Sequence, residues 1–294
     1  DMGHEQVEIK RVFLYPRLME GCYQRFTAQI RNGLVFHSDD IVLGPQQQIR
    51  ETTQSLDNNY GENQIKVAGS ALKLLSRSAY AWPKGVIPYT IDNELEPQRA
   101  LIEGAMEEWN QKTNVTFVDF DSHKDWLQIK FGTNAELWRL HFIRDSSIGN
   151  ASYVGLRKYE FEGLENAQPL WLSPRARHET VLHELGHAIG LWHEHNRPDR
   201  DQFVKIFNEH ILEDRADNFQ VNDGKTIGEY DHKSIMHYSS SIFSKEGYPT
   251  FYVRESIHVS ERASVGRYKH ISQGDIEAVN AIYPEIEEDD RVRP

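Results

Sequence analysis

The segment 183–193, which reads HELGHAIGLWH, constrains the fold of this chain more than any other stretch. Its apolar pattern predicts a buried helix. His183 and His187 stand four residues apart, so their rings project from one face of that helix, about 5–6 Å apart at Cβ. Gly190 can end the helix in a left-handed conformation, which turns the chain so that His193 comes back toward the other two. The spacing therefore predicts three imidazoles that converge on one point.

Three converging imidazoles indicate a metal site. Imidazole nitrogens bind zinc at roughly 2.0–2.1 Å, and three protein ligands leave a fourth position for water, as in catalytic zinc sites. Glu184 lies next to the first ligand and can take a proton from that water as general base. Structural zinc sites rely on cysteine, and Cys22 is the only cysteine of the chain. We therefore expect one catalytic Zn2+, in preference to a structural zinc or to histidines without a metal.

The composition argues against two classes of partner. The net charge of −12 disfavours nucleic-acid binding, which needs clustered lysine and arginine. No apolar run approaches the roughly 20 residues of a membrane span. The chain starts DMGHE, without a basic and then apolar leader, so we expect that any signal peptide is already removed.

The pattern of expected elements favours an α+β fold. The first seventy or so residues are more polar than the rest, and we expect them to lie on a folded domain rather than to form one. Beyond them strands and helices are mixed without strict alternation. Pro88 cannot donate to a ladder, which places its strand at a sheet edge. The expected strands are 34–36, 86–91, 115–120, 127–131 and 151–156. The expected helices are 97–112, 175–190, 202–219 and 272–282, the last capped by Ser272.

The stretch 183–201, HELGHAIGLWHEHNRPDRD, resembles the signature of the astacin family of metzincin peptidases. Other stretches extend the likeness over most of residues 76–285: WPKGVIPYTI at 82–91, RALIEGAMEEWNQKTNVTFV at 99–118, SIMHY at 234–238, and 272–284. The resemblance implies an astacin-like catalytic domain over 76–294 behind an inhibitory pro-segment over 1–75. It also implies two subdomains, at about 76–190 and 191–294, that flank a zinc cleft.

The resemblance assigns roles to individual residues, starting with the three histidine ligands and the general base Glu184. Met236 matches a methionine that packs beneath the metal. Tyr238 matches a tyrosine that ligates zinc and swings away to stabilise the tetrahedral intermediate. Glu194 matches a glutamate that engages the new N-terminus after activation. Other polar residues of this region are expected to be structural or to surround the ligands: His178, His195, Asp199, Arg200, Asp201 and His237.

The chain departs from the family in its cysteines. Astacin domains commonly carry two disulfides, whereas residues 76–294 contain no cysteine. The loops that such bridges would hold must be fixed by packing or by a bound ion. The strand over 151–155 resembles the edge to which a substrate of the family adds.

The N-terminal segment offers two ways to silence a zinc site. Cys22 follows Gly21, and a thiolate bound in place of water would remove the nucleophile. Astacin pro-segments often use an aspartate within an F-x-G-D motif, of which Phe36-His37-Ser38-Asp39-Asp40 is an imperfect copy because the glycine is missing. We expect Cys22 to be the ligand of the latent form, with Asp39 or Asp40 as the rival. Maturation is expected to cut between 61 and 79.

These features together predict a secreted zinc metalloendopeptidase that hydrolyses polypeptides and is held latent by its own pro-segment in cis. Two alternatives stay open. One is a zinc amidase that acts on a substrate other than protein. The other is a non-catalytic binding module that keeps zinc structurally, which Glu184 disfavours because such a site needs no base.

Overall fold

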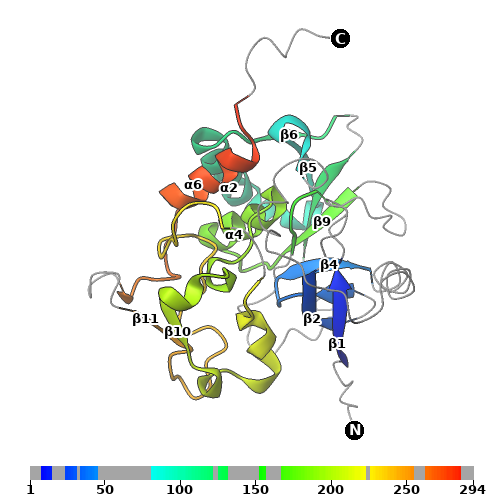
Figure 1. The fold of residues 1–294 in the computed structure, drawn as a ribbon. Coiled ribbons are helices and arrows are strands. Elements are labelled where there is room, and N and C mark those ends of the chain that lie inside the picture. Colours follow the sequence, from blue (N-terminus) through cyan, green and yellow to red (C-terminus); the bar gives the residue numbers. More distant parts are fainter. Residues whose placement is uncertain are drawn as a thin grey trace, which may run out of the picture.

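The structure, a computed structural model, describes residues 8–14, 24–31, 34–45, 81–121, 125–131, 152–156, 167–222, 226–254 and 262–285. Figure 1 shows three regions: a sheet with helices at the top, loops with short helices at the lower left, and N-terminal strands at the lower right. None of the helices within these ranges has the length and the apolar character needed to cross a bilayer.

Four parallel strands form the upper sheet, in the order β6-β5-β7-β9. Their bounds are Val86–Ile91 for β5, Thr116–Asp119 for β6, Trp126–Phe131 for β7 and Ala167–Leu172 for β9. β5 lies inside the sheet, so the prediction of an edge strand is wrong. Pro88 pairs with Val118 of β6, whereas the pairing of β5 with β7 starts only at Tyr89. The proline therefore lies where its strand has a partner on one side only.

Two helices share the main core with this sheet: α2 (Arg99–Lys112) and α4 (His178–Ile189). Trp109 of α2 is fully buried and donates its indole N–H to the carbonyl oxygen of Leu182 in α4 at 3.2 Å. α2 starts later than predicted because Pro97 lies in the preceding 3-10 helix. α4 ends at Gly190, whose φ of 134° confirms the predicted helix end. Three further residues of α2 are buried, and Leu101 is half-buried; the three are Ile102, Ala105 and Met106.

The lower left region contains short 3-10 helices and a two-stranded sheet, β10 (Val204–Ile206) with β11 (Phe251–Val253). The helix predicted over 202–219 is wrong, because the alternation of buried Val204 and exposed Lys205 suits a paired strand.

α6 (Gln273–Ile282) follows a capping box at Ser272, which confirms that cap. Among the described residues, the 3-10 helices are Pro83–Gly85, Asn93–Gln98, Glu194–Asn196, Arg200–Gln202, Asn208–His210 and Glu213–Phe219.

The described part of the N-terminal segment forms four strands: β1 (Glu8–Leu14), β2 (Gln24–Arg31), β3 (Leu34–Phe36) and β4 (Ile41–Pro45). They pair antiparallel in chain order, and β4 adds in parallel to β8 (Ser152–Tyr153). The predicted strand over 34–36 is confirmed. The segment thus has a sheet of its own, at the lower right of Figure 1. The sheet continues into the later chain through β8.

Candidate metal centre and active site

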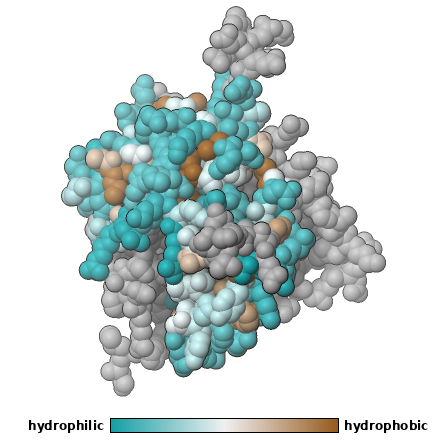
Figure 2. Space-filling view, turned by 90° about the vertical axis from the view of Figure 1, so that its left-hand side faces the viewer, coloured by the Kyte–Doolittle hydropathy of each residue, from teal (hydrophilic) through white to brown (hydrophobic). Residues whose placement is uncertain are grey.

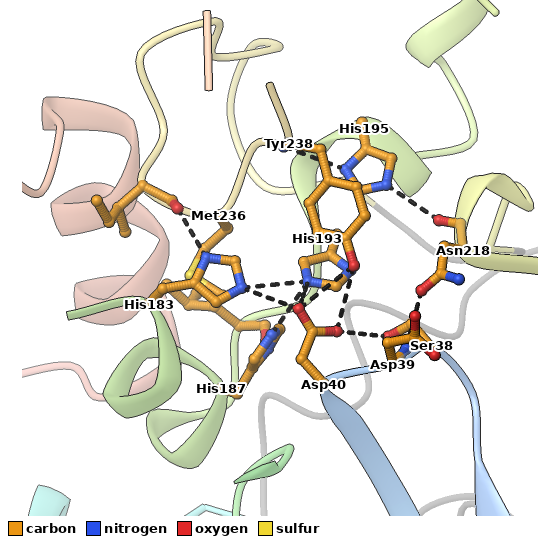
Figure 3. Close-up of polar contacts among 12 residues, drawn as sticks. Ser38, Asp39, Asp40, His183, His187, His193, His195, Asn218, Met236 and Tyr238 are labelled. Carbon is orange, nitrogen blue, oxygen red and sulfur yellow. Dashed lines mark hydrogen bonds and ion pairs between the residues drawn. The ribbon is translucent and has the colours of Figure 1, made fainter. Parts of the chain in front are cut away.

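Three histidines converge as their spacing predicts (Figure 3). His183 and His187 project from one face of α4, and His193 follows the turn at Gly190. The Nε2 atom of His193 lies 3.2 Å from Nε2 of His183 and 3.2 Å from Nε2 of His187. His187 and His193 are buried, and His183 is mostly so.

The backbone fixes the tautomers of the two helical histidines. Nδ1 of His183 lies 2.8 Å from the carbonyl oxygen of Ile235, and Nδ1 of His187 lies 2.8 Å from that of Leu191. A carbonyl oxygen only accepts, so each Nδ1 carries the hydrogen and each Nε2 keeps a lone pair. Burial lowers the pKa of His187 and of His193, which favours their neutral forms. Lone pairs that face one another within a buried site suit a divalent metal ion, so these residues fit the zinc that the sequence predicts.

Asp40 is the fourth member of the cluster. Its Oδ2 lies 3.2 Å from Nε2 of His193 and 3.5 Å from Nε2 of His183. The ligand atoms of all four residues lie within 4.8 Å of one another. Ser38 donates its hydroxyl to Oδ1 of Asp40 at 2.8 Å. Burial favours the neutral carboxyl, but the neighbouring histidines outweigh it and hold the pKa of Asp40 well below its usual range.

The two neighbouring aspartates of the N-terminal segment point to different partners. Asp39 forms an ion pair with Arg215 at 3.2 Å, and its backbone N–H donates to Oδ1 of Asn218 at 2.8 Å. Only Asp40 reaches the histidines. Cys22 lies outside the described residues, so the structure places no cysteine relative to this site.

Glu184 is buried within α4, with 3% of its surface exposed. Its Oε2 has no hydrogen-bond partner among the described residues. Burial and then the charge of Asp40 raise the pKa of Glu184 well above its usual value. A buried carboxylate oxygen without a partner is costly. That cost is explained if the oxygen is kept ready for a proton or a water.

Tyr238 lies against the cluster, with its hydroxyl 3.3 Å from both carboxylate oxygens of Asp40. His195 holds it in place: the two rings stack at 4.1 Å, and the backbone N–H of Tyr238 donates to Nδ1 of His195 at 3.4 Å. Nε2 of His195 donates to the carbonyl oxygen of Asn218 at 3.0 Å. The sequence left His195 without a specific role. Its contact with Tyr238 depends on the fold and could not be predicted from the spacing of the histidines.

Met236 packs directly beneath α4. A Cβ on Gly186 would lie 2.6 Å from Sδ of Met236, so that helix position has no room for a side chain. Met236 is 1% exposed. The contact brings the segment 234–238 against the helix that carries His183 and His187, as a packing role requires.

Glu194, the residue after the third histidine, interacts with nearby loop residues. Its Oε1 accepts the backbone N–H of Asp231 at 2.8 Å and lies 3.2 Å from the guanidinium of Arg197. Burial raises its pKa to about 8, although Arg197 opposes this. Arg197 also forms an ion pair with Asp199, and Arg200 donates to backbone carbonyls. These arginines and Asp199 hold the loops after His193, in agreement with the structural role expected of Asp199 and Arg200.

Comparison with known proteins gives one family. A family model described as Astacin, a peptidase family, matches residues 74–284. The bone morphogenetic protein 1 homolog of Strongylocentrotus purpuratus is 34% identical over 215 residues, 71% of this chain and 31% of that protein. Zinc metalloproteinase nas-14 of Caenorhabditis elegans is 31% identical over 264 residues, 86% of this chain and 48% of that protein. The chain thus spans about a third and about half of these two relatives.

Solved structures agree. High choriolytic enzyme 1, a hatching enzyme zinc-protease from Oryzias latipes, superposes with a TM-score of 0.57 at 29% identity, covering 71% of this chain and 98% of that one. Myroilysin gives a TM-score of 0.48 at 21% identity over 72% of this chain and 99% of its own, a likeness too low to carry an argument. With a family model that covers most of its length and relatives above 30% identity, the chain belongs to the astacin family of zinc metalloendopeptidases.

Proposed function

We propose that the chain hydrolyses peptide bonds within polypeptides and that its N-terminal segment holds it latent through Asp40. The observation that carries the activity is the pairing of two features. Three histidine Nε2 atoms converge, and backbone carbonyls fix the lone pairs of two of them, His183 and His187. The buried Oε2 of Glu184 has no partner among the described residues. A structural metal site explains the first feature but has no use for the second.

Zinc, when bound, polarises a substrate carbonyl and lowers the pKa of a water toward about 7. His183, His187 and His193 hold it. Glu184 accepts a proton from the attacking water and passes it to the leaving amine. The hydroxyl of Tyr238 is released once Asp40 leaves, and it then donates a hydrogen bond to the oxyanion of the tetrahedral intermediate.

The latent state rests on two contacts of the N-terminal segment. Asp40 lies against the three histidine nitrogens, so on a bound zinc its carboxylate would take the place of the catalytic water. β4 pairs with β8 through Ile41–Ser152 and Val42–Tyr153, and Ser152 donates its N–H to the carbonyl of Asp40 at 2.9 Å. β8 belongs to the stretch expected to bind substrate as an added strand. The segment therefore covers both the metal and the substrate edge.

The geometry supports Asp40 over Cys22 as the inhibitory ligand. Cys22 at the metal would require Asp40 to leave the position it holds within 3.5 Å of two histidine nitrogens. The cysteine ligand remains a prediction that falls outside the described residues. The proposal also includes a boundary between pro-segment and catalytic domain near residue 75, a maturation cut between 61 and 79, and secretion.

The test is cleavage of an unfolded protein by the zinc-loaded chain before and after limited proteolysis of the N-terminal segment. Activity that appears only after trimming and disappears with a chelator supports the proposal. Full activity in the untrimmed chain would refute latency. No peptide cleavage after trimming, with zinc still bound, would favour an amidase with another substrate or a binding module.

A further inference from the structure

A second cluster of potential metal ligands lies about the start of α4, apart from the catalytic histidines. Glu108 belongs to α2, His178 is the first residue of α4, and His270 precedes the cap of α6. Their ligand atoms lie within 4.8 Å of one another. Three segments far apart in the sequence therefore bring two imidazoles and one carboxylate to one point.

The two carboxylate oxygens of Glu108 have different partners. Oε1 accepts from Nζ of Lys112 at 2.9 Å and from the backbone N–H of Ile271 at 3.1 Å. Oε2 faces Nε2 of His178 and Nδ1 of His270, each at 3.0 Å. One oxygen is thus held in place by hydrogen bonds while the other lies between two ring nitrogens. Ligating carboxylates are commonly oriented by hydrogen bonds in this way.

Two interpretations fit these distances. In the first, each imidazole donates an N–H to Oε2, and the cluster is a pair of ordinary hydrogen bonds. In the second, one ion replaces both hydrogens. Ligands of a tetrahedral ion at roughly 2.0–2.2 Å lie about 3.4 Å apart, so the nitrogens would move from Oε2 by only about 0.4 Å. His270 is 70% exposed at its side chain and His178 is 32% exposed, which leaves both rings free to make that shift.

We propose that Glu108, His178 and His270 form a second metal site that takes a divalent transition metal of the zinc class. Two imidazoles favour such ions over Mg2+ and Ca2+, which prefer oxygen ligands. The carboxylate binds through Oε2 alone, and water completes the coordination on the exposed side. The side of the molecule that Figure 2 turns toward the viewer is hydrophilic over most of its described residues. The exposed side chain of His270 gives hydrated ions access to the cluster.

The site would act as a clamp. It joins α2, the first turn of α4 and the segment before α6, which lie next to one another in Figure 1. The part of the chain from 76 to 294 has no cysteine with which to form such a link. A metal that binds only the folded state stabilises it in proportion to the logarithm of the free metal concentration. The clamp does not depend on catalysis, because the three converging histidines lie further along the chain, two in α4 and His193 after it.

The experiment measures bound zinc in the full chain, equilibrated at a fixed micromolar concentration of free Zn2+, and the Tm with and without added zinc. The test variant is His270→Gln, because glutamine can still donate a hydrogen bond to Glu108 but is a poor ligand. The control is His210→Gln, which removes a half-buried histidine whose Nδ1 contacts the Pro249 carbonyl.

We expect two zinc ions per chain in the wild type and in His210→Gln, and one in His270→Gln. Added zinc should raise the Tm of the first two proteins and not that of the third, while all three share one Tm without added zinc. One ion in the wild type would overturn the proposal. Two ions in His270→Gln would place the second ion elsewhere and would overturn it equally. A Glu108→Gln variant provides the same contrast if the histidine variant does not fold.

Discussion

Two clusters of histidine and carboxylate share helix α4, and they differ chiefly in burial. The catalytic cluster uses His183 and His187, and His187 is fully enclosed. The surface cluster uses His178, in the first turn, together with the exposed His270. Both place a carboxylate oxygen within 3.0–3.5 Å of ring nitrogens.

The difference lies in where the histidine hydrogens go. In the catalytic cluster, backbone carbonyls take the Nδ1 hydrogens of His183 and His187, which leaves lone pairs aimed inward. In the surface cluster, the ring nitrogens that face Glu108 can donate hydrogen bonds to its carboxylate. Water can also accept hydrogen bonds from them. Burial thus makes a metal close to obligatory at one site and optional at the other. The predictions below test that contrast.

The largest effect is expected from Glu184→Gln. Glutamine keeps the shape of the side chain but cannot accept the proton, so the trimmed chain should lose about 10²–10⁴ in kcat while still binding its catalytic zinc. The measurement is steady-state cleavage of a peptide, with metal analysis of the same sample. Glu179→Gln, on the first turn of the same helix and paired with Arg177, is the matched control and should keep its activity. A kcat within tenfold of wild type would rule out Glu184 as the base.

Tyr238→Phe should have the next largest effect, a loss of about 10²-fold in kcat, because one donor to the oxyanion is removed. Zinc affinity should change far less, since the three histidines remain. Tyr230→Phe is the control, a buried tyrosine whose hydroxyl bonds to His237 at 2.7 Å. Equal losses in both variants would assign Tyr238 a packing role only.

Asp40→Asn should release part of the latency. Losing a charged contact worth about 1.5–3 kcal/mol shifts the balance between covered and open sites by about tenfold or more. Peptide cleavage by the untrimmed variant should rise by that factor over the untrimmed wild type. Cys22→Ala is the comparison, and its activity should not rise. A leak in Cys22→Ala alone would restore the cysteine as the inhibitory ligand.

The sequence predicted one of these clusters and missed the other for a physical reason. The spacing of His183, His187 and Gly190 encodes its own geometry, since helix periodicity and a helix end are local properties. Glu108 and His270 are 162 residues apart, and only the packing of α2 beside α6 brings them together. A single sequence contains no periodic pattern that predicts a contact between residues so far apart.

The same limit explains the other differences. The sequence predicted only a helix over 202–219, and the strand at Val204 becomes evident from its pairing with β11. Pro88 was placed at an edge, although its strand is flanked on both sides over part of its length. The choice between Cys22 and Asp40 depended on a missing glycine in a short motif. The position of Asp40 follows instead from β4 pairing with β8, which no local pattern specifies.

The smallest effect concerns the stability of the surface cluster against acid. Burial opposes ionisation of Glu108, but hydrogen bonds from His178, His270, Lys112 and the N–H of Ile271 outweigh it and lower its pKa to about 2 from an ordinary 4.5. A lowered pKa in the folded state means that the ionised form stabilises the fold. That contribution is complete above pH 4.5 and is lost as the pH falls toward 2.

The measurement is the free energy of unfolding by urea in metal-free buffer at about pH 5.5 and at successively lower pH, for the wild type and Glu108→Gln. The wild type should be the more stable at the higher pH, and the difference should shrink as the pH falls below 4.5. Glu103→Gln, on the same helix and paired with the half-buried Arg99, should show little difference at any pH, because ion pairs that stay in contact with solvent contribute little. A gap between wild type and Glu108→Gln that stays constant with pH would mean that Glu108 stabilises the junction by packing and not by charge. Its polar contacts would then not favour the ionised form of Glu108 over the protonated one, and the carboxylate would not be held ready for a metal, which makes this small effect a check on the second site.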